Sequence, residues 1–176
     1  MTNPLIAARD AFAARHPEQR FEREGRDWGY IDCGEGPALL LIPGTLGRAD
    51  IFWQQIEALQ DHLRIIAVSY PASGGVADWA GDLVALLDRL GIDTATVLGS
   101  SLGGYLAQYM ASAAPARVTA LVAANTLHSV RGLEQRMPYA LELDTAPIED
   151  LRAGFGAGLS AWADSHTDQR DLVALL

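Results

Sequence analysis

Ser101 is the residue whose type and spacing point most directly to chemistry, because it lies in a Gly-x-Ser-x-Gly pattern bounded by Gly99 and Gly103. An apolar, β-branched run at residues 94–98 precedes the pattern, and a helical pattern follows it. In such a strand-to-helix turn the serine is strained and exposes its hydroxyl, and small neighbours let strand and helix pass closely. The N–H of Leu102 then lies at a helix N-terminus, where it can stabilise an oxyanion. The pattern predicts a nucleophilic serine for acyl transfer.

The pattern alone is weak, because glycine and serine are common and a Gly-rich loop can simply close a strand. A phosphate-binding loop would need glycines at the spacing of Gly99 and Gly104 followed by lysine, but Tyr105 occupies the lysine position. A dinucleotide-binding loop would need Gly-x-Gly-x-x-Gly after the first strand, and no such triplet occurs there. Of these alternatives, only the loop that closes a strand stays open.

The loop after the apolar run at residues 38–42 is expected to supply a second oxyanion donor. It reads Pro43-Gly44-Thr45-Leu46-Gly47, in which Gly44 permits a sharp turn of the backbone. The N–H of Thr45 is the natural partner of the N–H of Leu102. The alternative interpretation is an ordinary turn that ends a strand.

A nucleophilic serine needs a histidine that accepts its proton and a carboxylate that orients the histidine. Only two histidines follow the candidate nucleophile, His128 and His166. His128 lies just beyond a predicted strand at residues 118–124, at the edge where parallel sheets bind ligands, so it could line the pocket. His166 fits better as a solvated histidine of a helix. Asp144, with Asp164 as alternative, is the candidate acid, although a surface position explains either residue equally well.

The elements that must position these residues alternate between strands and helices. Strands are predicted at residues 26–33, 38–42, 64–68, 94–98 and 118–124, and helices at residues 5–15, 51–59, 76–90 and 102–113. Several of the strand runs are continuously apolar, as in parallel strands that are covered on both faces. Strands that alternate with helices of this length imply right-handed crossovers. The predicted fold class is α/β, with a mostly parallel sheet flanked by helices.

The pattern of residues changes near residue 130, from alternating strand and helix patterns to a loosely amphipathic stretch. We therefore predict a core over residues 1–130 and a helical segment over residues 131–176. The apolar residues of the second region could cover an apolar substrate. Packing of a helix against the core explains them equally well.

Composition excludes several classes of function. The sequence has 13 Lys and Arg residues and 22 Asp and Glu residues, which gives a net charge of −9. This negative charge disfavours nucleic acids and anionic membranes as partners. The single cysteine, Cys33, can form no internal disulfide. The opening residues Met1-Thr2-Asn3-Pro4 lack the basic start and the long apolar stretch that are typical of a secretory signal. No apolar run approaches the ~20 residues that span a bilayer. These features favour a cytoplasmic location. Because no His or Cys cluster has metal-ligand spacing, neither a metal nor an organic cofactor is implied.

Taken together, these motifs resemble the α/β-hydrolase family and, within it, the maspardin-like branch. The shared residues lie between about residues 38 and 128 and are Pro43, Gly47-x-Ala49-Asp50-x-Phe52, Tyr70-Pro71, Gly99-x-Ser101-Leu102-Gly103-Gly104-x-Leu106-Ala107-Gln108, Arg117-Val118 and Asn125. The resemblance implies a sheet rich in parallel strands, Ser101 at a nucleophile elbow, and an oxyanion hole formed by Leu102 and Thr45. Many members carry His-Gly before the oxyanion residue, whereas Pro43 precedes Gly44 here.

The family places its acid and its histidine after two further strands that this sequence does not show, so the resemblance implies that both lie beyond this chain. We therefore expect the N-terminal portion of a longer hydrolase, lacking the C-terminal strands, that is not catalytically complete alone. Alternatively, a homodimer covers the edge strand at residues 118–124. Residues 131–176 resemble the helical cap that many members insert after the sixth strand.

The implied function is that of a serine hydrolase, similar to carboxylesterases. It acts on an ester or related acyl bond of a small, fairly apolar molecule. The alternative is a non-catalytic, maspardin-like module that binds a protein partner, because that branch is associated with partner binding as well as with hydrolysis.

Overall fold

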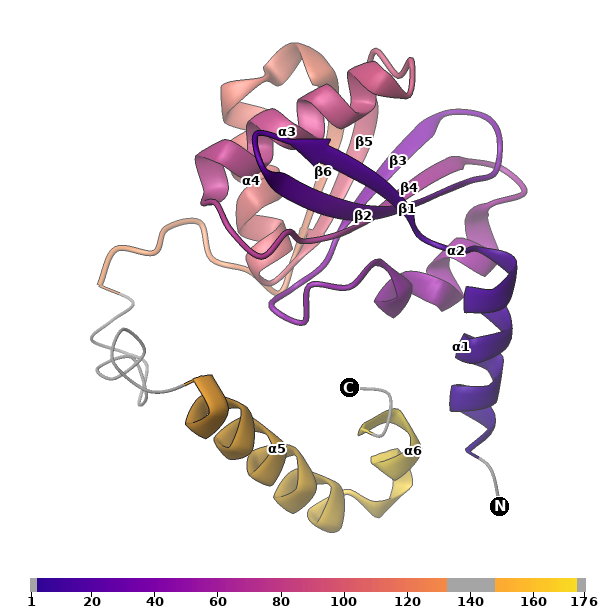
Figure 1. Ribbon diagram of the computed structural model, residues 1–176, viewed down its shortest axis with the longest axis vertical. Helices are drawn as coiled ribbons and strands as arrows, with labels where there is room; N and C mark the ends of the chain where they lie inside the picture. Colours follow the sequence, from indigo (N-terminus) through magenta and orange to yellow (C-terminus); the bar gives the residue numbers. More distant parts are fainter. Residues whose placement is uncertain (1–2, 133–147, 174–176) are drawn as a thin grey trace. The chain divides into compact units, whose positions relative to one another are not determined.

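The computed structural model describes residues 3–132 and 148–173, which fall into two compact units (Figure 1). The first unit is Ala11–His128 and contains a six-stranded sheet. The elements up to the end of this unit are α1 (Pro4–Arg15), β1 (Gln19–Arg23), β2 (Arg26–Cys33), β3 (Ala38–Ile42), η1 (Ala49–Phe52), α2 (Trp53–Leu59), β4 (Arg64–Ser69), α3 (Val76–Arg89), β5 (Ala95–Ser100), α4 (Leu102–Ala113), η2 (Pro115–Arg117) and β6 (Val118–Ala124).

The sheet is mixed, with the strand order β1-β2-β4-β3-β5-β6. The pairs β3–β4, β3–β5 and β5–β6 are parallel, whereas β1–β2 and β2–β4 are antiparallel. Because parallel strands end at the same edge of a sheet, the loops after β3, β5 and β6 lie together at that edge. The predicted α/β class, with its mostly parallel sheet and flanking helices, is confirmed.

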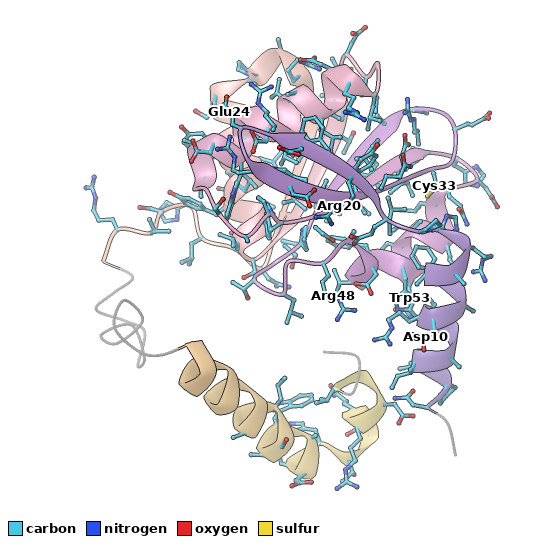
Figure 2. All side chains as sticks on the ribbon, viewed as in Figure 1. Asp10, Arg20, Glu24, Cys33, Arg48 and Trp53 are labelled. Carbon is cyan, nitrogen blue, oxygen red and sulfur yellow. The ribbon has the colours of Figure 1, made fainter. Side chains whose placement is uncertain are left out.

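β1, which lies at one edge of the sheet, was not predicted from the sequence. This strand has one buried side chain, Phe21, between exposed polar and charged residues. Its formation depends on pairing with β2 across a hairpin whose tip places Glu24 at φ +50° and Gly25 at φ +75°. Arg20 and Glu24 belong to this hairpin (Figure 2). β1 therefore forms because it pairs with β2, since its own sequence has little apolar pattern.

Apolar side chains pack on both faces of the sheet. One cluster joins the sheet to α3 and α4 and includes Leu40 and Leu83. The other joins the sheet to α1, η1 and α2 and includes Phe12, Leu41 and Ile56. Figure 1 shows α2 on the opposite side of the sheet from α3 and α4. Because Leu40 and Leu41 are consecutive residues of β3 in different clusters, β3 is buried on both faces, which explains its continuous apolar sequence.

A buried ionic network joins α3 to the β1–β2 hairpin. The Asp82 side chain, 1% exposed, accepts hydrogen bonds from Arg26 at 2.6 and 2.9 Å. The indole Nε1 of Trp28 donates to the same carboxylate at 3.0 Å, and Arg23 lies 3.3 Å from it. A buried carboxylate is tolerated only when it is paired and hydrogen-bonded, as it is here. The network therefore fixes α3 in position against β2.

The second unit takes in residues up to Asp10 and from Ser129 onward. Its elements after residue 147 are α5 (Ile148–Ser165), η5 (Thr167–Gln169) and α6 (Arg170–Val173). The described part of the predicted segment 131–176 is therefore largely helical. The division into regions 1–130 and 131–176 stays a prediction. None of the helices among the described residues is long and apolar enough to cross a membrane.

Candidate active site

Ser101 lies between β5 and α4 in a backbone conformation with φ +54° and ψ −118°. Such a conformation is rare for a residue with a side chain and costs about 1–3 kcal/mol, so surrounding contacts must enforce it. The Ser101 N–H donates to the carbonyl oxygen of Ala124 at 2.9 Å. The Ser101 carbonyl oxygen accepts a hydrogen bond from Oγ1 of Thr126 at 2.7 Å. The strained turn expected at Ser101 is therefore present, and the end of β6 holds it.

The glycines on either side of Ser101 permit a close approach of backbone to backbone. A Cβ atom at Gly99 would lie 2.0 Å from the carbonyl oxygen of Gly103. A Cβ atom at Gly103 would lie 2.2 Å from the carbonyl oxygen of Ile42 and 2.4 Å from that of Pro43. The first turn of α4 therefore packs directly against the end of β3.

The loop after β3 brings Thr45 close to Ser101. The N–H of Gly47 donates to the carbonyl oxygen of Gly44 at 3.0 Å, which closes a turn with Thr45 and Leu46 at its centre. A Cβ atom at Gly44 would lie 3.3 Å from Cβ and 3.9 Å from Oγ of Ser101. The structure thus gathers the Thr45 loop, Ser101 and the first turn of α4, which carries Leu102, at one edge of the sheet.

A cavity of about 310 Å³ opens beside Ser101. Its lining residues are Gly44, Thr45, Leu46, Ile51, Phe52, Gln55, Ser100 and Ser101. The volume is at the lower end of the range for small-molecule pockets. Leu46, Ile51 and Phe52 make much of the lining apolar, and Gln55 contributes an amide. The cavity therefore suits a small, mostly apolar ligand.

A second cavity, of about 430 Å³, has a more polar lining that includes part of the same loop. Arg48, labelled in Figure 2, forms a two-pronged ion pair with Asp50 at 2.9 and 2.6 Å. The Ser69 hydroxyl donates to Glu18 at 2.5 Å and accepts from the N–H of Ala49 at 2.8 Å. These polar groups hydrogen-bond to one another and to the backbone after β3, so they stabilise the loop that follows β3.

Two residues that hold the site, Gln108 and Tyr70, had no role predicted from the sequence. Gln108 donates from Nε2 to the carbonyl oxygens of Gly104 and Leu127 at 3.1 and 3.0 Å, which ties α4 to the segment after β6. The Tyr70 hydroxyl donates to the carbonyl oxygen of Pro43 at 2.8 Å. Gln108 and Tyr70 were both among the residues shared with the family. That resemblance was the only signal, because their partners are distant in sequence or are backbone atoms.

The two candidate histidines differ in their surroundings. His128 is exposed in the segment after β6, and it is not among the residues that line the cavity beside Ser101. In the second unit, the ring of His166 stacks on Trp162 with 4.2 Å between ring centres, and its Nδ1 lies 3.0 Å from the Trp162 carbonyl oxygen. These contacts are typical of a histidine that ends a helix, the role expected for His166. The pocket-lining role of His128 stays a prediction.

Of the two candidate acids, only Asp164 lies within the described residues. It pairs with Arg170 at 3.3 Å in an exposed ion pair, a kind of contact that contributes little to stability. Asp144 lies outside the described residues. A role for either carboxylate beside a catalytic histidine therefore stays a prediction.

A family model described as "alpha/beta hydrolase fold" matches residues 37–159. Maspardin from Rattus norvegicus is 36% identical over 92 residues, which cover 50% of this chain and 35% of the rat protein. The chain therefore spans about a third of the length of that relative.

Solved structures show the same similarity in three dimensions. A hydrolase from Pseudomonas aeruginosa matches with a TM-score of 0.64 and 27% identity, over 79% of this chain and 57% of that one. The carboxylesterase CesB from Bacillus subtilis matches with a TM-score of 0.53 and 27% identity, over 65% of this chain and 46% of that one. Both neighbours are named for hydrolytic activity.

Proposed function

Because the chain belongs to the α/β-hydrolase fold family, we propose that it is a serine hydrolase with Ser101 as its nucleophile. The observation that carries the proposal is the positive φ of Ser101 at a strand-to-helix turn beside a cavity. Backbone strain of this kind costs free energy and is concentrated at functional sites. A Gly-rich loop that only closed a strand would not need a strained serine at its apex.

In the proposed reaction, Oγ of Ser101 attacks the acyl carbon of the substrate while a histidine base takes the hydroxyl proton. The carbonyl oxygen becomes an oxyanion that accepts hydrogen bonds from the N–H groups of Leu102 and Thr45. One such donor typically contributes a factor of about 10²–10³ in kcat. The histidine then returns the proton to the leaving group, and water hydrolyses the acyl-enzyme to release the acid.

The cavity beside Ser101 supports a small, fairly apolar acyl substrate. Its volume of about 310 Å³ and the apolar side chains of Leu46, Ile51 and Phe52 favour a short hydrocarbon group. An ester fits this lining because its reacting carbonyl is uncharged. Similarity to a carboxylesterase supports the same substrate class.

A fluorophosphonate probe, which reacts with activated serines, tests the proposed nucleophile. We expect the full gene product to be labelled, mass spectrometry to place the adduct on Ser101, and Ser101→Ala to remove the label because it deletes the attacking oxygen. The matched control is Ser112→Ala, which removes an exposed hydroxyl from the same helix α4 and keeps full labelling. His128→Gln and His166→Gln identify a base within this sequence if either one suppresses labelling.

Labelling that survives in Ser101→Ala would show that the nucleophile lies elsewhere. A folded gene product that takes up no probe would favour the second candidate function, binding of a protein partner without catalysis. The observation that favours this alternative is the edge strand β6, where Leu121 and Val122 are 40% and 46% exposed. Similarity to maspardin motivates the same alternative.

A further inference from the structure

Tyr70 contacts both ends of the loop that carries Thr45. Its hydroxyl donates to the carbonyl oxygen of Pro43 at 2.8 Å, and its backbone N–H donates to the carbonyl oxygen of Gly47 at 2.9 Å. Pro43 is the first residue after β3, and Gly47 closes the turn that has Thr45 near its centre. A single residue after β4 therefore holds the loop at its beginning and at its end.

Two tryptophans hold the Tyr70 ring in place. The ring stacks on Trp79 with 4.8 Å between centres and an interplanar angle of 24°, and it meets Trp28 edge-on at 5.7 Å. Each indole N–H is itself engaged: that of Trp79 donates to the carbonyl oxygen of Ser73 at 2.9 Å, and that of Trp28 donates to Asp82 at 3.0 Å. The packing of the Tyr70 ring against Trp28 and Trp79 therefore fixes the direction in which the Tyr70 hydroxyl points.

The carbonyl oxygen of Pro43 also adjoins α4, because a Cβ atom at Gly103 would lie 2.4 Å from it. The same carbonyl group thus connects the Thr45 loop, which receives the Tyr70 hydrogen bond, to the helix turn that begins with Leu102. A small movement of Pro43 would move the N–H of Thr45 relative to that of Leu102.

We propose that Tyr70 is a positioning residue of the oxyanion hole, which holds the N–H of Thr45 at the distance from Leu102 that the transition state requires. This inference rests on the proposed serine hydrolase function. Oxyanion donors act only when they lie about 2.7–3.1 Å from the developing charge, so loss of the anchor lowers catalysis without removing a catalytic atom.

The hydroxyl keeps its proton over a wide range of pH. Burial raises the pKa of Tyr70 above its ordinary value. The hydrogen bond to Pro43 is therefore present at neutral and at moderately alkaline pH, where ester hydrolysis is measured. An ionised tyrosine could not donate this bond.

The test compares Tyr70→Phe with Tyr30→Phe in the full gene product. Both changes delete one tyrosine hydroxyl and keep the ring, but the Tyr30 hydroxyl donates to the side chain of Gln19 at 3.1 Å, which is not part of the site. With p-nitrophenyl butyrate as substrate, we expect Tyr70→Phe to lower kcat about tenfold with little change in KM. The Ki of phenylboronic acid, whose serine adduct mimics the tetrahedral intermediate, should rise about as much. Tyr30→Phe should leave kcat, KM and Ki unchanged.

Hydrogen exchange gives a readout that does not depend on turnover. We expect faster exchange of the amides of residues 44–47 in Tyr70→Phe and wild-type exchange there in Tyr30→Phe. If Ser101→Ala abolishes turnover but Tyr70→Phe behaves like Tyr30→Phe in kcat, Ki and exchange, the positioning role is wrong. Turnover that is absent from the wild-type protein, or that survives in Ser101→Ala, would instead contradict the proposed function itself.

Discussion

Gly103→Ala lowers the free energy of unfolding by about 3 kcal/mol or more and suppresses fluorophosphonate labelling of Ser101. The added Cβ would lie 2.2 Å from the carbonyl oxygen of Ile42 and 2.4 Å from that of Pro43. Both are backbone atoms of β3 and its loop, so α4 must move away from the sheet to accommodate the methyl group. That movement separates the N–H of Leu102 from the N–H of Thr45. Urea denaturation and probe labelling of the same preparation measure the two effects.

Gly81→Ala is the matched control for Gly103→Ala. Gly81 is an interior residue of α3, and a Cβ atom there would meet nothing within 4 Å. Alanine is a better helix former than glycine, so this variant should gain up to about 1 kcal/mol of stability and keep full labelling. Equal stability changes in the two variants would contradict the close approach of α4 to β3.

Asp82→Ala lowers the free energy of unfolding by about 2–3 kcal/mol at pH 7. The substitution leaves the buried indole N–H of Trp28 without its acceptor, and it leaves the guanidinium group of Arg26 with only the exposed carboxylate of Glu24 as partner. It also releases α3 from the β1–β2 hairpin. Urea denaturation at pH 7 measures the loss. The matched control is Asp27→Ala, which breaks an exposed ion pair with Arg20 on the same hairpin and should change stability little.

The contribution of Asp82 depends on pH. Burial by itself raises the pKa of this carboxyl, but hydrogen bonds from Arg26 and Trp28 and the nearby positive charges outweigh burial and lower the pKa below its ordinary value. A lowered folded-state pKa gives stability that is fully present above the unfolded-state pKa of about 3.9 and is lost as the pH falls through the folded-state value. The stability difference between wild type and Asp82→Ala should therefore narrow below about pH 4. A difference that is the same at pH 7 and pH 3 would contradict a buried, ionised Asp82.

Much of the parallel sheet and its helices could be predicted from the sequence alone. The predicted bounds of two strands that adjoin the site, residues 38–42 and 118–124, are those of β3 and β6, and the predicted helix at residues 102–113 is α4. The signals are local: a continuous apolar run marks β3, and turn residues mark the ends of each element. β1 carries a single apolar residue, Phe21, so its strand exists only because β2 pairs with it.

The strained turn at Ser101 could be predicted from the sequence, because the close contact that Gly99 permits is with Gly103, only four residues further along the chain. The close contact that Gly103 permits is with Ile42 and Pro43, and only the tertiary structure brings these residues to it. What holds the turn was decided by the tertiary structure. The hydrogen bond from Thr126 to Ser101 joins residues 25 positions apart, and the bond from Tyr70 to Pro43 joins residues 27 positions apart. Such contacts depend on the spatial order of the strands in the sheet, in which β3 lies between β4 and β5. No pattern of adjacent residues records that order, since it results from which apolar faces can be buried together.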